Sequence, residues 1–269
     1  MSMLEVLEKE LKNFKIYEEK FNHLRELLQI LILKIFQQAG FFKNLAFVGG
    51  TALRLLFDLR RFSEDLDFSL IRKKGYNLKN IANVLRKRLN EYNLSPEIKT
   101  KKEKVISILE VKFKKLLFDL KLSNLPEQKV FIKIEIDTNP PSGYNTEVSL
   151  INKLFVFDVV HFDLPSLYAT KIHACFFRKY VKGRDFYDLM WYLTKKVTPN
   201  YRLLNNAIAQ TYKKENIFIN SENFKEFLKS RLLKIDFAKV KKDVERFLEN
   251  KEELELFRKE IFLNLVEKL

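Results

Sequence analysis

The feature that most restricts the fold of this chain is a pair of adjacent glycines, Gly49 and Gly50, between two segments of different periodicity. Residues 45–48 form a short apolar run typical of a buried strand, whereas residues 51–58 have the spacing of an amphipathic helix. Glycine has no Cβ, so the backbone at this junction can approach a bulky group closely. The start of a helix also offers free N–H groups and a favourable dipole to an anion. The junction therefore predicts a strand–turn–helix unit suited to phosphate.

A second apolar strand, residues 66–70, follows the predicted helix. Asp65 and Asp67 alternate with Leu66 and Phe68, so the two carboxylates share one face of this strand. Carboxylate oxygens are preferred ligands of Mg²⁺. A glycine pair is most often only a turn, and an Asp-x-Asp pair is most often only solvated. The two patterns in this order, with a helix between them, favour a metal and nucleotide site.

A third carboxylate is expected from residues 130–137, which alternate as a strand with isoleucines on one side. Glu135 and Asp137 both lie on the polar side, and Glu135 is our first choice. A cluster of three carboxylates can hold two metal ions against a nucleoside triphosphate (NTP) and so stabilise both the attacking and the leaving oxygen.

The composition of the chain changes near residue 164, after which nearly every segment has helical spacing. We expect an α+β fold: a nucleotide-binding core with a mixed sheet and an N-terminal helix at residues 1–163, then a helical C-terminal domain at 164–269. The N-terminal helix is expected to span residues 4–39. Other expected elements are a helix at 78–92, β-structure at 98–114, and C-terminal helices at 166–180, 184–195, 205–215, 223–233, 237–247 and 252–265.

A second polar cluster lies at the start of the helical half. Lys171 and Arg178 share one helical face, and Asp185 and Asp188 share a face of the next predicted helix. One interpretation is an ion-paired helical hairpin, which is a common arrangement. The other is that Lys171 reaches the triphosphate as a point charge while Asp185 and Asp188 orient it.

The chain carries 50 Lys and Arg against 35 Asp and Glu, a net charge of +15 over 269 residues. Such a surplus suits a polyanionic partner such as RNA, although a solvated lysine-rich surface gives the same number. The single cysteine excludes an internal disulfide. The chain shows neither a signal peptide nor a membrane span, so we expect a cytoplasmic protein. The candidate RNA contacts are residues 72–74, 86–88 and 99–104.

Together these blocks resemble the AbiEii/AbiGii toxin family of nucleotidyltransferases, within the DNA polymerase β-like superfamily. The resemblance extends from about residue 45 to residue 190. It rests on Gly49-Gly50-Thr51-Ala52-Leu53-Arg54, Arg61-Phe62-Ser63-x-Asp65-Leu66-Asp67-Phe68, Lys171-Ile172-His173-Ala174 and Arg184-Asp185-x-x-Asp188-Leu189.

The resemblance implies a nucleotidyltransferase with a helical C-terminal domain, an NTP donor, and Mg²⁺ as cofactor with Mn²⁺ as an alternative. It implies that Asp65 and Asp67 bind metal and act in catalysis together with Lys171 and Asp185. Further implied contacts are with the nucleotide and its phosphates, through Gly49, Gly50, Thr51, Ser63, Arg184 and Asp188.

The resemblance also implies a toxin of a toxin–antitoxin or phage-defence (abortive infection) system, neutralised by a cognate antitoxin. The leading activity that the resemblance implies is transfer of a nucleotide to an RNA acceptor such as a tRNA 3′ end. Two alternatives remain open: transfer to a protein or small molecule, and an inactive module that only binds nucleotide or RNA. Label that survives RNase would favour transfer to a protein or small molecule. Binding of nucleotide or RNA without release of pyrophosphate would favour an inactive module.

Overall fold

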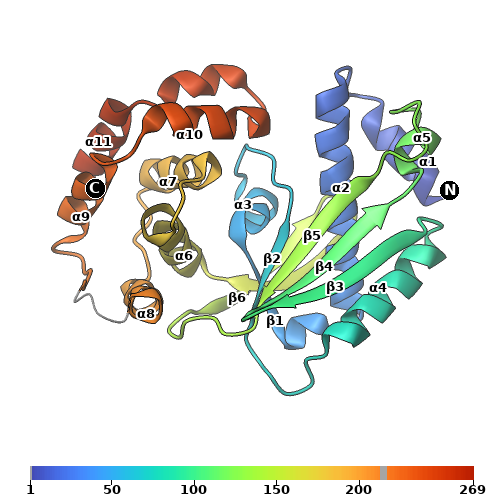
Figure 1. Cartoon of the computed structure of the whole chain (residues 1–269), viewed down its shortest axis with the longest axis horizontal. Coiled ribbons are helices and arrows are strands. Elements are labelled where there is room, and N and C mark those ends of the chain that lie inside the picture. The colour runs from blue at the N-terminus through green and yellow to red at the C-terminus, as the bar shows by residue number, and fades with distance from the viewer. Residues whose placement is uncertain (1, 213–216) are drawn as a thin grey trace. The chain divides into compact units, whose positions relative to one another are not determined.

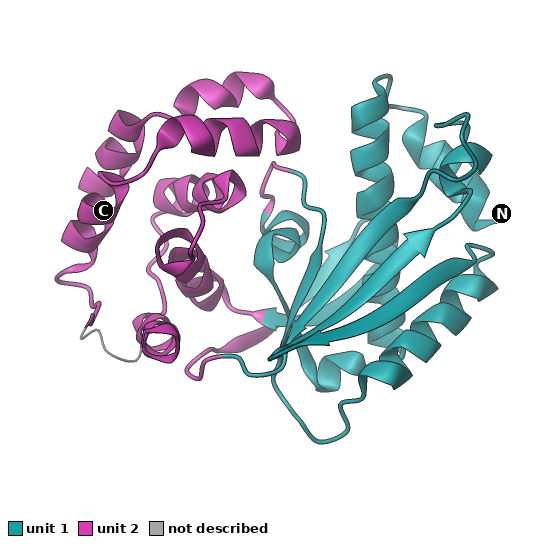
Figure 2. Ribbon diagram, viewed as in Figure 1, with its two compact units in different colours: residues 1–57, 62–140, 148–161 teal, residues 58–61, 141–147, 162–269 magenta. Residues whose placement is uncertain are grey.

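A computed structural model describes residues 2–212 and 217–269 of the chain (Figure 1). It divides into two compact units, shown in different colours in Figure 2. Unit 1 comprises residues 1–57, 62–140 and 148–161, and unit 2 comprises residues 58–61, 141–147 and 162–269.

In the described part of the chain, seven strands form one mixed sheet in the order β3-β4-β5-β2-β1-β7-β6. Strand β2 is antiparallel to β1 and parallel to β5, and β4 is antiparallel to both β3 and β5. The strands are β1 (Leu45–Val48), β2 (Leu66–Leu70), β3 (Pro96–Glu103), β4 (Ile106–Phe113), β5 (Val130–Asp137), β6 (Thr146–Asn152) and β7 (Val156–Phe162).

One face of this sheet is packed against helices and holds the core of unit 1. The alternation in β5 puts Ile132, Ile134 and Ile136 on this face, and all three are fully buried. Phe68 of β2 stacks on Phe36 of the long helix α2. The helices of unit 1 are α1 (Met3–Leu11), α2 (Tyr17–Gln38), α3 (Gly49–Phe57), α4 (Leu78–Glu91) and α5 (Leu116–Asp119), with a short 3-10 turn η1 (Phe41–Lys43).

The other face of the sheet, which we call the open face, carries the polar residues of the alternating strands. Asp67 of β2 and Glu135 of β5 lie on it, since their neighbours along each strand point into the core. The predicted metal-binding residues of β2 and β5 therefore lie on one face of the sheet.

The predicted continuous helix over residues 4–39 is wrong, because the chain breaks between α1 and α2. Ser2 and Glu5 form a capping box at the start of α1, and the chain turns after Lys12. Phe14 then stacks on His23 of α2, with ring centroids 3.7 Å apart. This contact folds α1 back against α2, so an apolar pattern that is continuous in sequence becomes two packed helices.

The predicted β-structure at residues 98–114 is two strands, β3 and β4, joined by a tight turn at Lys104 with φ 52°. The helix predicted at 78–92 agrees with α4, whose N-cap Asn77 accepts the N–H of Asn80. Strands β6 and β7 were not predicted. Half of β6 is exposed on both faces, so it lacks the alternation that marks the other strands.

Unit 2 is mostly helical in its described residues. Tyr168 and Tyr192 stack within it with ring centroids 4.2 Å apart, and Phe186 and Phe262 are fully buried. The elements are α6 (Leu164–Phe177), α7 (Gly183–Lys195), α8 (Tyr201–Thr211), α9 (Phe224–Leu232), α10 (Phe237–Val244), η2 (Glu245–Phe247), η3 (Lys251–Leu256) and α11 (Lys259–Glu267).

Each predicted helical range of unit 2 overlaps an observed helix, but the bounds differ. The block 252–265 is wrong as one helix: buried Phe257 stacks on Tyr187 and separates η3 from α11. Helix α8 starts at Tyr201, four residues before the predicted helix at 205–215, whose last residues, 213–215, lie outside the described residues. Gly183 begins α7, and a Cβ there would overlap the carbonyl oxygen of Val240 in α10.

The α+β fold with a mixed sheet and a helical C-terminal part is therefore confirmed. Among residues 2–212 and 217–269, every helix is either too short or too polar to span a lipid bilayer.

Candidate active site

The two predicted carboxylates of β2 and β5 lie side by side. Strands β2 and β5 run parallel with Asp67 opposite Glu135, so both side chains project from neighbouring positions of the open face. Asp65 comes one residue before the first paired position of β2, Leu66 opposite Ile134, and so lies level with Lys133 of β5. All three acidic side chains are partly accessible to solvent. The sheet register thus sets Asp67 directly beside Glu135, with Asp65 two residues before Asp67 in the same unit.

Lys133 lies among these carboxylates. Its Nζ is 2.7 Å from Oε1 of Glu135. Partial burial opposes the charged form of Lys133, but the hydrogen bond to Glu135 and the negative charges of Asp65 and Asp67 outweigh burial and raise the pKa of Lys133. Glu135 therefore already holds a cation, and the negative charges of Asp65 and Asp67 favour its presence.

Asp137 occupies a different position from Glu135. It lies opposite Ser69 rather than opposite an aspartate, and its Oδ1 accepts the N–H of Asn139 at the end of β5. Burial raises the pKa of Asp137 although that hydrogen bond acts in the opposite sense. Of the two residues left open by the sequence, Glu135 is the one placed beside Asp67.

The glycine pair forms the first turn of α3 and lies against the carboxylates. Gly49 has φ +79°, and a Cβ on it would overlap the carboxylate of Asp67 and lie 2.9 Å from the Asp67 Cβ. The hydroxyl of buried Thr51 donates to the backbone carbonyl of Asp65. The Gln29 side chain in α2 donates to the Ser63 carbonyl at 3.1 Å. The start of α3 and the two strand aspartates therefore form one connected structure.

Replacing Gly49 with alanine is expected to damage this structure. The new methyl group must displace the Asp67 carboxylate, and the left-handed backbone is itself strained for alanine. We expect the rate of nucleotide turnover to fall by about 10²-fold, the effect of moving a catalytic group by roughly 1 Å. Pyrophosphate release measures the rate.

Gly75→Ala is the matched control for this prediction. Gly75 has φ +87°, but its Cβ would meet nothing nearer than Asn44 Oδ1 at 4.0 Å. It therefore shares the backbone strain and lacks the overlap. Equal activity of the two variants would contradict the role given to Gly49.

The predicted ion-paired hairpin is present in unit 2. Lys171 of α6 reaches two aspartates of α7, with its Nζ 2.7 Å from Asp185 Oδ1 and 2.8 Å from Asp188 Oδ2. Arg178 lies 3.1 Å from the other oxygen of Asp185. Arg61, which precedes β2 in the chain, donates through Nε and Nη2 to the two oxygens of Asp188 at 2.6 and 2.7 Å.

Apart from Arg178, whose side chain is 44% exposed, the side chains of this network are almost wholly buried. Burial opposes the charged form of Asp185, but Lys171 and Arg178 outweigh it and lower the pKa of Asp185 to about 2. Burial also opposes the charge on Lys171, and the two aspartates outweigh it and raise the pKa of Lys171. The buried part of the network therefore comprises two cations, Lys171 and Arg61, and two aspartates, the balanced condition under which buried ion pairs persist.

Arg184 and His173, the other polar residues of these motifs, make structural contacts. The Arg184 guanidinium lies 4.5 Å from the centroid of the Phe247 ring. The His173 ring stacks on Phe177, and its Nε2 lies 2.9 Å from Thr211 Oγ1. Burial, followed by the positive charge of Arg178, lowers the pKa of His173 to about 4.

His173 makes the stability of the protein depend on pH. Its pKa is about 4 when folded and 6.5 in an ordinary environment, so the unfolded chain binds more protons between these values. We expect the free energy of unfolding to decrease by about 2 to 3 kcal/mol as the pH falls from about 6.5 to about 4. Urea unfolding at several pH values measures it, and His173→Gln should remove most of this decrease. An unchanged pH profile in the variant would contradict the assignment.

Two residues with evident electrostatic roles were not singled out by the sequence. Arg61 lies two positions before Ser63, within the motif that carries the two aspartates. Lys133 lies two positions before Glu135, within the alternating run of residues 130–137. Alternation did place Lys133 on the polar face of its strand. Nothing local indicates that Arg61 pairs with Asp188, 127 residues away.

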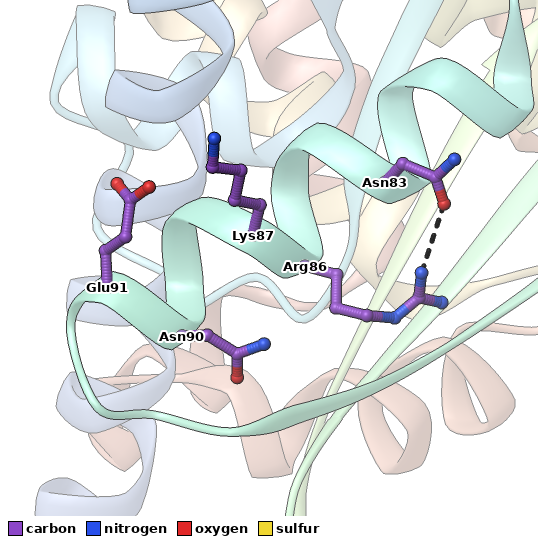
Figure 3. A pocket seen from close by; sticks show the side chains of 5 residues that line it. All are labelled: Asn83, Arg86, Lys87, Asn90 and Glu91. Carbon is purple, nitrogen blue, oxygen red and sulfur yellow. Dashed lines mark hydrogen bonds between the residues drawn. The ribbon is translucent and has the colours of Figure 1, made fainter.

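A shallow surface depression lies elsewhere in unit 1. It is formed on the outer side of α4 by Asn83, Arg86, Lys87, Asn90 and Glu91 (Figure 3). Arg86 is fixed there by hydrogen bonds to Asn83 Oδ1 and to the Ile98 carbonyl, both at 3.1 Å. Helix α4 packs on the core face of the sheet, so this depression is distinct from the open face and its carboxylates.

The donor set of the open face fits a magnesium ion. Asp65, Asp67 and Glu135 offer only carboxylate oxygens, the ligands that this ion prefers, and Glu135 already contacts the ammonium group of Lys133. Within residues 2–212 and 217–269, no three acidic, histidine or cysteine side chains are grouped as a ready metal site. Glu135 is turned toward Lys133 in this arrangement.

Comparison with known proteins gives a family match and similar solved structures. A family model described as nucleotidyl transferase AbiEii toxin, type IV toxin–antitoxin system, matches residues 31–259. The crystal structure of JHP933 from Helicobacter pylori is similar at 20% identity, with 92% of this chain and 93% of that chain covered and a TM-score of 0.52. A protein from H. pylori described as a proposed nucleotidyltransferase has 19% identity, coverage of 91% and 95%, and a TM-score of 0.47. No curated protein matches the chain.

The match covers most of the chain and includes both groups of motifs. The chain therefore belongs to the AbiEii family of nucleotidyltransferase toxins of type IV toxin–antitoxin systems. It is a nucleotidyltransferase, and its family implies an NTP and an antitoxin as partners. The family predicted from the sequence is confirmed; the fold it shares with JHP933 is supported independently by the structural similarity.

Proposed function

We propose that this nucleotidyltransferase transfers a nucleoside monophosphate from an NTP to an RNA acceptor such as a tRNA 3′ end, with Mg²⁺ as cofactor. The observation that carries the proposal is the sheet register that sets Asp67 beside Glu135, with Gly49 packed against Asp67. This arrangement combines a carboxylate group for metal with a helix start for phosphate.

The residues of unit 1 have distinct tasks in this proposal. Asp65, Asp67 and Glu135 hold Mg²⁺, which when bound neutralises triphosphate charge and favours departure of pyrophosphate. Backbone N–H groups at Gly49 and Gly50 bind phosphate oxygens, helped by the dipole of α3. Thr51 fixes the main chain of Asp65, and Ser63 borders the same turn.

The reaction is a substitution at the α-phosphorus. A hydroxyl oxygen of the acceptor bonds to this phosphorus, the bond to the bridging oxygen of the β-phosphate breaks, and pyrophosphate leaves. The hydroxyl proton passes to a carboxylate of the group or to water. Positioning of both substrates accounts for most of the rate, since the protein itself forms no covalent bond.

Residues of unit 2 also have catalytic roles in this proposal. Lys171 and Asp185 are the lysine and aspartate that the family motifs place in catalysis, with Arg184 and Asp188 beside them. Their ion pairing gives Lys171 one fixed position and keeps it charged at neutral pH. The positive surface of the chain, net +15, favours an RNA acceptor over a small cation. We extend the proposal to a role as a toxin in phage defence by abortive infection.

One experiment tests the acceptor and the donor together. Purified protein is incubated with Mg²⁺, total small RNA and each α-labelled NTP in turn, and the products are treated with RNase or protease. We expect RNase-sensitive label and added nucleotides at RNA 3′ ends on sequencing. Label that survives RNase would show that the acceptor is a protein and not RNA. Binding of NTP or RNA without release of pyrophosphate would contradict the proposal.

A further inference from the structure

The open face carries a line of side chains that leads away from the carboxylates along β5. Phe131, Lys133 and Glu135 are alternate residues of this strand and therefore share the face. On the neighbouring strand β4, Lys112 lies opposite Phe131 and Glu110 opposite Lys133. Phe131 is about 13 Å from Glu135 along the strand, at 3.3 Å per residue.

Phe131 is an unusual residue for this position. It is 40% exposed, whereas its neighbours Val130 and Ile132 are fully buried in the core. The Nζ of Lys112 lies 5.6 Å from the centroid of the Phe131 ring. The sheet thus presents an aromatic ring to solvent with a cation beside it, which is the combination that binds a stacked base and its phosphate.

The surroundings of Phe131 are rich in positive charge. Residues 96–115, which include the neighbouring strands β3 and β4, contain seven Lys and three Glu, a net charge of +4. Lysines of the open face pair with glutamates nearby: Lys112 with Glu110 at 3.0 Å, and Lys99 with Glu97 at 3.5 Å. Such partly exposed pairs contribute little to stability, so a phosphate can replace the glutamates as partner.

We propose that Phe131 and Lys112 form a stacking subsite for an unpaired nucleotide of the acceptor strand, whose end then reaches Asp67 and Glu135. The inference rests on the RNA acceptor of the proposed function and assigns that strand a path along β5. Single-stranded RNA is the ligand, because an exposed ring on a sheet binds an unstacked base and not a base inside a duplex.

Binding to RNA without NTP tests the subsite separately from catalysis. The probe is a fluorescein-labelled single-stranded RNA of about ten nucleotides, followed by fluorescence anisotropy at low salt. We expect Phe131→Ala to weaken binding by about 5- to 100-fold, since stacking supplies this much per base, and Phe131→Tyr to bind as the wild type does. Nucleotide binding and thermal stability should not change.

Phe118→Ala is the matched control. Phe118 lies in α5 of the same unit and is 47% exposed, so it loses a similar area of accessible ring. Equal RNA affinity of Phe131→Ala and the wild type, or an equal loss in both alanine variants, would overturn the subsite. Failure of the wild-type protein to bind the RNA probe would also overturn the subsite.

The outcome for the subsite can be told apart from the outcome for the proposed function. RNA that is labelled equally well by Phe131→Ala overturns the subsite and leaves transfer to RNA standing. Phe131-dependent binding without labelling of any RNA supports the subsite and overturns transfer to RNA.

Discussion

Asp67→Asn is expected to reduce nucleotidyl transfer by at least about 10³-fold while the protein stays folded. Asparagine has the shape of aspartate, so the contact with Gly49 and the register opposite Glu135 are kept. The substitution removes one negative charge from a group that must hold a divalent cation against a triphosphate. Pyrophosphate release with Mg²⁺ and each NTP measures the loss, and circular dichroism verifies the fold.

The two other candidates of β5 give matched variants for this prediction. Glu135→Gln should cause a loss close to that of Asp67→Asn, because the two carboxylates are paired in register. Asp137→Asn should retain most activity, since Asp137 lies opposite Ser69 and accepts the N–H of Asn139. A protein with Asp67→Asn that keeps more than about a tenth of the wild-type rate would contradict the metal-binding role.

Asp188→Ala is expected to lower the free energy of unfolding by about 3 to 5 kcal/mol, the usual result of removing one partner from a buried ion pair. Asp188 is fully buried and accepts from Arg61 and Lys171. Without it, Arg61 loses both of its hydrogen bonds to the Asp188 carboxylate while it remains in a desolvated position. Urea denaturation followed by circular dichroism measures the change.

The control for Asp188 is a carboxylate on the surface of the same unit. Glu222 is exposed, so Glu222→Ala should change stability by no more than about 0.5 kcal/mol. Asp188→Asn keeps the volume and should destabilise less than alanine, because its amide oxygen still accepts one hydrogen bond. A stability of Asp188→Ala within about 1 kcal/mol of the wild type would show that water or another acceptor satisfies the two cations.

Local periodicity predicted much of the fold because it reports which face of an element is buried. The alternation of isoleucines in residues 130–137 predicted β5 and its polar face, and the bounds agree with the structure. The glycine pair predicted the junction of β1 and α3. The break after Lys12 was missed because Phe14 continues the apolar pattern and is redirected only by its contact with His23.

The sequence by itself determined the types of residue in the candidate site and the strand faces that carry them, since alternation and helical spacing are local properties of the chain. Tertiary structure alone decided which residues meet. Strand register set Glu135 rather than Asp137 beside Asp67, and helix packing joined Arg61 to Asp188 across 127 positions. The physical reason is that a pattern along one element fixes a direction for each side chain, whereas register and packing depend on the summed burial of every element against its neighbours.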